Sequence, residues 1–185
     1  MRQPLRLLDL GCGDARLIPA LLDRLEVELY EGVDSSEPAL ERAQANLAGL
    51  PARLTRADLL ARVSQDGPPF TLGMASYSAH HLRPEQRPAF YSRLKSLAPC
   101  WLFLDVMRPD QDTREAFNAR LLERSRHDWA SLTQEEYALV HEHIQTSDYP
   151  ISRAELLALT EPHGFRLDIL WSDPVATGKL FRLLR

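Results

Sequence analysis

A glycine turn and a later acidic residue have the types and spacing to bind a nucleotide-like ligand. Gly11 and Gly13 follow the apolar run 5–10 and precede a helical pattern, so the backbone there can approach a ligand closely. The first N–H groups of such a helix are unpaired and favour an anionic group. Asp34 ends the next apolar run, where a carboxylate can accept hydrogen bonds from both hydroxyls of an adenosine ribose.

Apolar runs that alternate with helical patterns supply the elements that would position these residues. We expect the first strands at 5–10, 27–33, 52–57, 70–77 and 101–107. We expect helices at 15–25, 37–48 and 84–98, the second with Ser36 as its N-cap and the third with Phe90, Leu94 and Leu97 facing inward. Strands and helices in this alternation predict an α/β fold with a doubly wound, mostly parallel sheet.

The first of these helices carries a mixed signal. Its leucines are spaced so that several would share one inward face, namely Leu17, Leu21, Leu22 and Leu25. Pro19 lies inside the same pattern and lacks a backbone donor, so it should kink the helix or delay its start.

The rhythm changes after the fifth strand, where residues 110–147 are helical and polar without an intervening strand. Thr133 and Glu136 form a capping box for a helix that runs to about residue 146. We therefore expect a helical insertion at about 110–150 on a single domain that spans residues 1–185.

The last part of the chain returns to strands. Ser152 and Glu155 form a capping box for a helix at 153–161, which Gly164 would end. We expect strands at 165–171 and 179–184, joined by a turn at 173–178. These two strands are close enough in sequence to pair as an antiparallel hairpin, which gives a sheet of about seven strands.

Composition excludes several classes of protein. The net charge of −4 gives no broad basic face for nucleic acid. No apolar run approaches the ~20 residues that cross a bilayer, and the N-terminus lacks the pattern of a signal peptide. Cys12 and Cys100 form no disulfide framework, so we expect a reducing, cytoplasmic location.

Five segments together resemble class I S-adenosylmethionine (SAM)-dependent methyltransferases. LLDLGCGDARL at 7–17 resembles the glycine motif of that family, and YEGVDSSEPAL at 30–40 resembles its acidic motif on the second strand. RADLL at 56–60 resembles the adenine motif, and FTLGMASYSAHHL at 70–82 resembles the fourth strand of small-molecule members. HGFRLDILW at 163–171 is similar to the family's Gly-Phe turn into strand six.

The resemblance implies a set of cofactor-binding residues for SAM. Asp9 and the backbone of the glycine turn would surround the methionine end, and Asp34 would bind the ribose hydroxyls. Asp58 would meet the adenine amino group, while Leu59 packs on the ring. The full set is Asp9, Gly11, Cys12, Gly13, Asp34, Ser35, Asp58, Leu59, Ser76 and Tyr77.

Methyl transfer also implies candidate catalytic residues. The cofactor supplies the activated carbon, so the protein mainly aligns the acceptor, which we expect to be a small molecule. A neutral oxygen or nitrogen acceptor needs a base, and His80, His81 and Asp105 are candidates because they follow strands four and five. The alternative is that the histidine rings bond only to the backbone.

The insertion and its approach supply further polar residues. Arg108 could clamp an anionic acceptor, whereas Trp129 and Tyr137 are more typical of packing residues. His141 and His143 are two residues apart on a helix and point apart, so this segment is not interpreted as a metal motif. The sequence thus predicts no metal site.

Three alternatives remain beside the methyltransferase hypothesis. A nicotinamide site would need a small residue where Arg16 stands, so SAM is favoured. The C-terminal part is also loosely similar to carboxy-SAM synthases, which use SAM for other chemistry. A protein that binds SAM without catalysis is the third alternative, while a nucleic-acid methyltransferase is disfavoured by the absence of a basic stripe.

Overall fold

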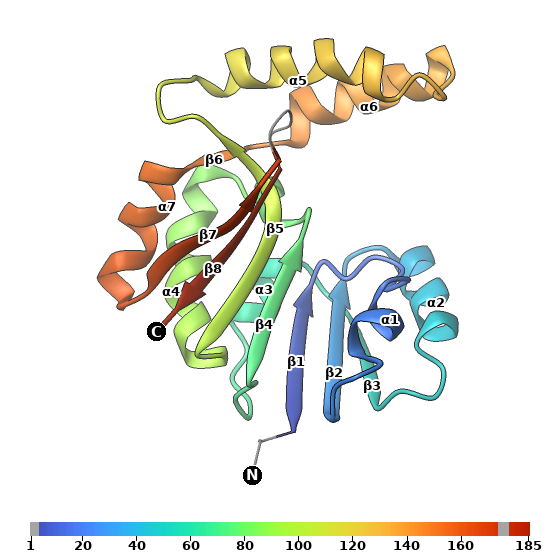
Figure 1. Cartoon of the computed structure of the whole chain (residues 1–185), viewed down its shortest axis with the longest axis vertical. Coiled ribbons are helices and arrows are strands. Elements are labelled where there is room, and N and C mark those ends of the chain that lie inside the picture. The colour runs from blue at the N-terminus through green and yellow to red at the C-terminus, as the bar shows by residue number, and fades with distance from the viewer. Residues whose placement is uncertain (1–3, 174–177) are drawn as a thin grey trace.

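A twisted sheet of eight strands forms the centre of the molecule in a computed structural model, which describes residues 4–173 and 178–185 (Figure 1). Its strands lie in the order β3-β2-β1-β4-β5-β8-β7, and the short β6 pairs with β5. The strands are β1 (Leu5–Leu10), β2 (Val27–Asp34), β3 (Ala52–Arg56), β4 (Leu72–Ser76), β5 (Cys100–Arg108), β6 (Ile151–Ser152), β7 (Arg166–Ser172) and β8 (Gly178–Leu184).

The pairing of these strands confirms the expected doubly wound fold with a C-terminal hairpin. β1 pairs in parallel with both β2 and β4, and β4 pairs in parallel with β5. β8 runs antiparallel to both β5 and β7. The strand order reverses at β1, which is where ligands bind in sheets of this kind, beyond the carboxyl ends of the strands.

Helices cover the sheet unevenly (Figure 1). α1 and α2 lie beside β1–β3, α3, α4 and α7 pack behind the sheet, and α5 and α6 lie beyond the end of β5 as the expected insertion. The helices are α1 (Ile18–Leu22), α2 (Glu37–Asn46), α3 (Leu59–Val63), α4 (Arg87–Leu97), α5 (Arg114–Asp128), α6 (Gln134–Ser147) and α7 (Arg153–Thr160). No helix in the described ranges has both the length and the apolar character that crossing a membrane requires.

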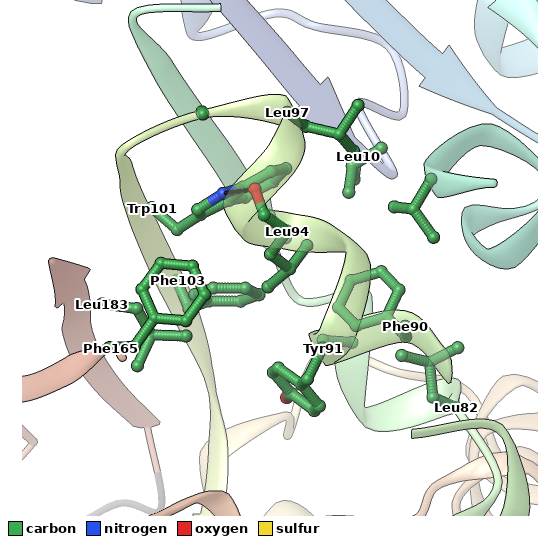
Figure 2. Packing of buried hydrophobic residues seen from close by; sticks show 14 of the residues in the cluster. Leu10, Leu82, Phe90, Tyr91, Leu94, Leu97, Trp101, Phe103, Phe165 and Leu183 are labelled. Atoms are coloured by element: carbon green, nitrogen blue, oxygen red, sulfur yellow. Dashed lines mark hydrogen bonds between the residues drawn. The ribbon is translucent and has the colours of Figure 1, made fainter. Parts of the chain in front are cut away.

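The larger core lies between the sheet and α4 (Figure 2). Phe90, Leu94 and Leu97 face inward from α4 as expected, and all three are buried. Trp101 and Phe103 of β5 pack beneath them, and the Trp101 indole N–H donates to the Leu94 carbonyl at 3.0 Å. This packing fixes β4 and β5, the two strands whose ends carry the candidate catalytic residues.

The expected inward face of the first helix is wrong for three of its four leucines, whereas Leu22 is buried as expected. α1 begins only at Ile18, with Pro19 in its first turn, so the proline delays the helix as anticipated. Ile18 and Leu22 therefore turn inward, whereas Leu17, Leu21 and Leu25 are 68%, 60% and 54% exposed. A start three residues later than expected rotates the buried stripe, because each helical residue turns by about 100°.

Other local expectations agree with the structure, with two differences. Ser36, Thr133 and Ser152 cap α2, α6 and α7, and Gly164 ends the helical segment after α7 with φ +80°. The short helix α3 was missed, and the expected helix at 84–98 starts as a 3₁₀ turn before α4. Within the expected turn at 173–178, residues 174–177 lie outside the described residues.

Candidate functional site

The glycine turn after β1 and the end of β2 meet as the sequence motifs predict. Gly11 has φ +76°, and a Cβ there would lie 2.3 Å from the Cβ of Ser78. The Gly13 N–H donates to Asp34 Oδ2 at 2.8 Å, and the Ser36 N–H donates to Asp34 Oδ1 at 2.8 Å. The Asp34 carboxylate thus joins the glycine turn to the end of β2, and it lies at the rim of a cavity.

This cavity, which we call the cofactor cavity, has a volume of about 620 Å³. It opens at the carboxyl ends of β1, β2 and β4, where the strand order reverses. Eight of the ten residues proposed for cofactor binding line it, namely Gly11, Gly13, Asp34, Ser35, Asp58, Leu59, Ser76 and Tyr77. Its size falls in the range of pockets that bind small molecules and cofactors.

The other two proposed cofactor residues, Asp9 and Cys12, line a neighbouring hollow of about 560 Å³ that shares the glycine turn. Asp9 is buried and accepts a hydrogen bond from the Tyr30 hydroxyl at 2.7 Å. Burial, together with the charge of Asp34, raises the pKa of Asp9 to about 7. Its Oδ1 has no hydrogen-bond partner among the described residues, so one polar atom of this carboxyl stands ready for a donor.

Two further residues at the rim of the cofactor cavity also stabilise the local fold. Asp58 caps α3, with its Oδ1 accepting from the Ala61 N–H at 2.8 Å. Tyr77 follows β4 with φ +48°, and its N–H donates to the Leu104 carbonyl at 2.7 Å. A bulky residue in a left-handed conformation is strained, and such strain is frequent where a chain turns sharply beside a ligand.

The three candidate catalytic residues come together just beyond Tyr77. His80 Nδ1 lies 2.5 Å from Asp105 Oδ1, and the His80 N–H donates to Asp105 Oδ2 at 3.1 Å. Both residues are buried, so the carboxylate fixes the orientation of the ring. The His81 ring lies beside the His80 ring, 4.0 Å away between centroids, and lines the cofactor cavity. The nearby Asp148 carboxylate raises the pKa of His81.

A second cavity of about 490 Å³, which we call the acceptor cavity, lies between these residues and the insertion. Its walls come from the ends of β4 and β5 and from α5 and α6. Tyr77, His81 and His143 line both this cavity and the cofactor cavity, so these three side chains form the boundary between them.

Sequence reasoning gave no role in the site to several polar residues of the acceptor cavity, among them His143, Arg124 and Asp148. Arg124 donates from Nε to Asp128 Oδ2 at 2.7 Å, while its buried Nη1 has no partner within the part of the chain that the structure describes. No local motif marks these positions, because residues of α5, of α6 and of the segment after α6 meet the ends of β4 and β5 only in the folded chain.

Arg108, expected to reach the acceptor, lies elsewhere. Its guanidinium pairs with Glu155 and donates to the Asp112 carbonyl at 2.6 Å, in a separate hollow. Trp129 lines the acceptor cavity and is 40% exposed, so it is not the packing residue that was expected. Tyr137 does pack, because its hydroxyl donates to the Leu122 carbonyl at 2.7 Å.

Comparison with known proteins identifies the family. Residues 7–99, just over half of the chain, match the family model described as a methyltransferase domain. The match includes the glycine turn, Asp34, Asp58 and both candidate histidines. A comparison with curated proteins gave no match.

Solved structures of similar fold agree with this family. YcgJ from Bacillus subtilis superposes with a TM-score of 0.64 at 16% identity, covering 92% of this chain and 65% of that one. The plantazolicin methyltransferase BamL, solved with S-adenosylhomocysteine (SAH), gives 0.67 at 18%, covering 95% and 64%. Magnesium protoporphyrin IX methyltransferase from Synechocystis, solved with SAM, gives 0.61 at 19%, covering 98% and 70%.

These identities are low, so the superpositions concern the fold, and the chain spans less than two thirds of the length of the first two proteins. The sequence match, the reversed strand order and the cavity beside Asp34 all point in one direction. The chain belongs to the methyltransferase-domain family, the class I SAM-dependent methyltransferases with a Rossmann-like fold.

Proposed function

We propose that this chain transfers the methyl group of SAM, held in the cofactor cavity, to a small-molecule acceptor held in the acceptor cavity. The observation that carries the proposal is the shared boundary of Tyr77, His81 and His143, which brings the two cavities into contact at the end of β4. A donor and an acceptor on either side of that boundary would meet without crossing bulk water.

The residues of the cofactor cavity fit SAM. The Gly11 position leaves room that a Cβ would fill, so the backbone can approach the ligand there. Asp34 offers a carboxylate at the rim for the ribose hydroxyls, even though two N–H groups already bond to it, because each oxygen has two lone pairs. Bound SAM supplies an electrophilic methyl group on a positively charged sulfur.

Side chains at the boundary between the two cavities would position the acceptor and remove its proton. Asp105 orients the His80 ring through Nδ1, and His81 faces both cavities, so these three residues are the proposed catalytic group. Leu121, Val140 and Ile144 give the acceptor cavity an apolar wall from α5 and α6. Its volume of about 490 Å³ favours a small acceptor over a folded macromolecule.

A calorimetric titration of the purified chain with SAM, SAH and NAD tests the cofactor. We expect SAM and SAH to bind and NAD not to bind. Asp34→Ala removes the ribose acceptor and should weaken SAM binding about 10- to 100-fold, because hydrogen bonds to charged groups are worth about 1.5–3 kcal/mol. Asp23→Ala, which deletes an exposed carboxylate after α1, is the matched control and should change nothing.

Transfer is then measured as SAH release over a panel of small acceptors carrying hydroxyl, amine or carboxylate groups. Release that depends on one acceptor class supports the proposal. SAM binding that Asp34→Ala does not weaken would contradict the assigned cavity. SAM binding with no acceptor-dependent release across the panel would favour a role other than methyl transfer.

A further inference from the structure

Three histidine nitrogens surround one carboxylate oxygen in the wall of the acceptor cavity. Asp148 Oδ1 lies 3.3 Å from His81 Nδ1, 3.4 Å from His143 Nε2 and 3.6 Å from His80 Nε2. The Asp148 side chain is only 9% exposed. Its Oδ1 makes no hydrogen bond among residues 4–173 and 178–185, so a buried carboxylate oxygen faces three histidine nitrogens at ion-pair distances without a hydrogen bond.

The His80 ring presents a lone pair to this carboxylate. Asp105 Oδ1 lies 2.5 Å from His80 Nδ1, and this carboxylate contact favours the tautomer in which Nδ1 donates to Asp105. Nε2 then carries a lone pair directed at Asp148. A histidine held at one nitrogen by a carboxylate, with the other nitrogen free, is the usual arrangement of a metal-bound histidine.

The backbone around the cluster is tied in place from two sides. The Asp148 carbonyl accepts from Arg114 Nε at 2.7 Å and from Asn118 Nδ2 at 3.4 Å. The Tyr149 N–H donates to the His80 carbonyl at 2.7 Å, which links the end of α6 to the turn after β4. The backbone that carries His80 and Asp148 is thus fixed independently of any ion, and a specific metal site requires such support.

The spacing of the atoms suits a metal ion better than a proton. One proton can join one nitrogen to the oxygen, whereas three nitrogens face the same atom. Ligands that lie about 2.0–2.2 Å from a tetrahedral Zn²⁺ ion are separated from one another by about 3.3–3.6 Å. The three nitrogen–oxygen distances fall in this interval, and the ligand atoms of His80, His81 and Asp148 all lie within 4.8 Å of one another.

We propose that His80, His81 and Asp148 bind a divalent transition-metal ion such as Zn²⁺, with His143 beside the fourth coordination position. Imidazole nitrogens with one carboxylate are ligands that Zn²⁺ accepts. Sequence reasoning singled out His80 and His81 only as candidate bases, because Asp148 follows them by more than sixty residues and reaches them only where α6 meets the turn after β4.

The role of the ion rests on the proposed methyl transfer and makes it more specific. A hydroxyl group of the acceptor would occupy the fourth position, where the ion lowers its pKa and its proton passes to water. The resulting oxygen attacks the methyl carbon, so that a C–O bond forms as the S–C bond breaks and neutral SAH leaves. His80 and His81 would therefore act through the ion rather than as bases.

A metal titration tests the site without any acceptor. The purified full chain is freed of metal with a chelator, then titrated with Zn²⁺ in competition with a chromogenic chelator and with Co²⁺ by visible absorption. We expect one ion per chain. Asp148→Asn and His81→Ala should each weaken binding about 100-fold or more, and Asp105→Asn about 10- to 100-fold, since it only orients His80. His127→Ala, an exposed histidine on α5, is the matched control.

Circular dichroism and SAM titration of the same samples report folding separately. His81 is 40% exposed, so its alanine variant should fold even where an Asp148 variant does not. A folded chain that binds no ion, or an ion whose affinity survives both Asp148→Asn and His81→Ala, overturns the site. SAM binding without metal binding refutes this proposal alone, while metal binding without SAM binding refutes only the proposed function.

Discussion

The two cavities are built by different means. The cofactor cavity is built around backbone turns, at the glycine turn after β1 and at the ends of β2 and β4. The acceptor cavity is shaped by side chains, which reach it from α5 and α6 and from the turn after β4. Backbone turns depend on residues that are adjacent in sequence, whereas converging side chains depend on how distant elements pack. The residues around the cofactor cavity can therefore be recognised from short motifs, whereas most of those around the acceptor cavity cannot.

The carboxylates at the two cavities also differ in the partners that they contact. In the cofactor cavity, Asp34 is bonded to two backbone N–H groups and keeps a local, self-contained geometry. At the acceptor cavity, the buried Asp148 lies 3.3 Å from His81, and the buried Asp105 contacts His80, a residue that lines the cavity. Substitutions at the cofactor cavity should change SAM binding. Substitutions confined to the acceptor cavity should change methyl transfer and leave SAM binding intact.

The largest effect is expected at the glycine turn. Gly11→Ala combines a positive φ with a Cβ that would meet Ser78 at 2.3 Å, so it should cost about 2–5 kcal/mol of unfolding free energy and abolish SAM binding. Gly13→Ala also has a positive φ, but no atom of the described chain lies within 4 Å of its Cβ. It should cost about 1–2 kcal/mol. Equal losses in urea denaturation would show that backbone strain, not the contact with Ser78, sets the cost.

The next effect concerns the pH dependence of stability through Asp9. Its pKa is about 7 in the folded chain and about 3.9 when unfolded, so the folded state holds the proton more tightly. The protonated Asp9 carboxyl stabilises the folded state fully below about pH 4, and this stabilisation is lost as pH rises through about 7. The Asp9→Asn variant cannot ionise at this position, so its unfolding free energy should not show that loss.

Between about pH 5 and pH 8, the variant should therefore lose about 2–3 kcal/mol less unfolding free energy than the natural chain. Urea denaturation at the two pH values measures the difference. Asp23→Asn, at an exposed aspartate, should leave the natural pH dependence intact. The same pH dependence in Asp9→Asn and the natural chain would mean that Asp9 is ionised in the folded state.

A filled acceptor cavity should separate transfer from cofactor binding. Val140→Trp places a large ring in that cavity from α6 and should reduce transfer about 10-fold or more, while SAM affinity changes less than about 2-fold. Leu139→Trp alters the adjacent, 67% exposed position and is the control. A parallel loss of SAM affinity in Val140→Trp would show that the two cavities are one functional space.

The smallest expected change in unfolding free energy comes from removing a helix cap, either at α6 beside the acceptor cavity or at α2 beside the strands of the cofactor cavity. Thr133→Ala removes the cap of α6, and Ser36→Ala removes the cap of α2, each at a cost of about 1 kcal/mol. Hydrogen exchange should speed up in α6 alone for the first variant and in α2 alone for the second. Faster exchange in both helices for either variant would mean that the two helices unfold as one unit.

Sequence-based predictions agree with the structure for local features such as helix caps, and they fail for features that depend on how an element starts or packs. Ser36, Thr133 and Ser152 were recognised as caps because a cap needs only a side chain and the next helical turn. The buried face of α1 was wrong because it depends on where the helix starts, and Pro19 moved that start to Ile18. The helix α3 spans only Leu59–Val63, which is too short for its periodicity to be recognised.

The sequence alone determined the order of the strands and helices other than α3 and β6, the glycine turn and the acidic end of β2, because each of these depends on residues close together in the chain. Only the tertiary structure decided that Arg108 pairs with Glu155, that Asp148 faces three histidines and that two cavities share a wall. Those features depend on the distance between side chains from separate elements, which is set when α5 and α6 pack over the ends of β4 and β5.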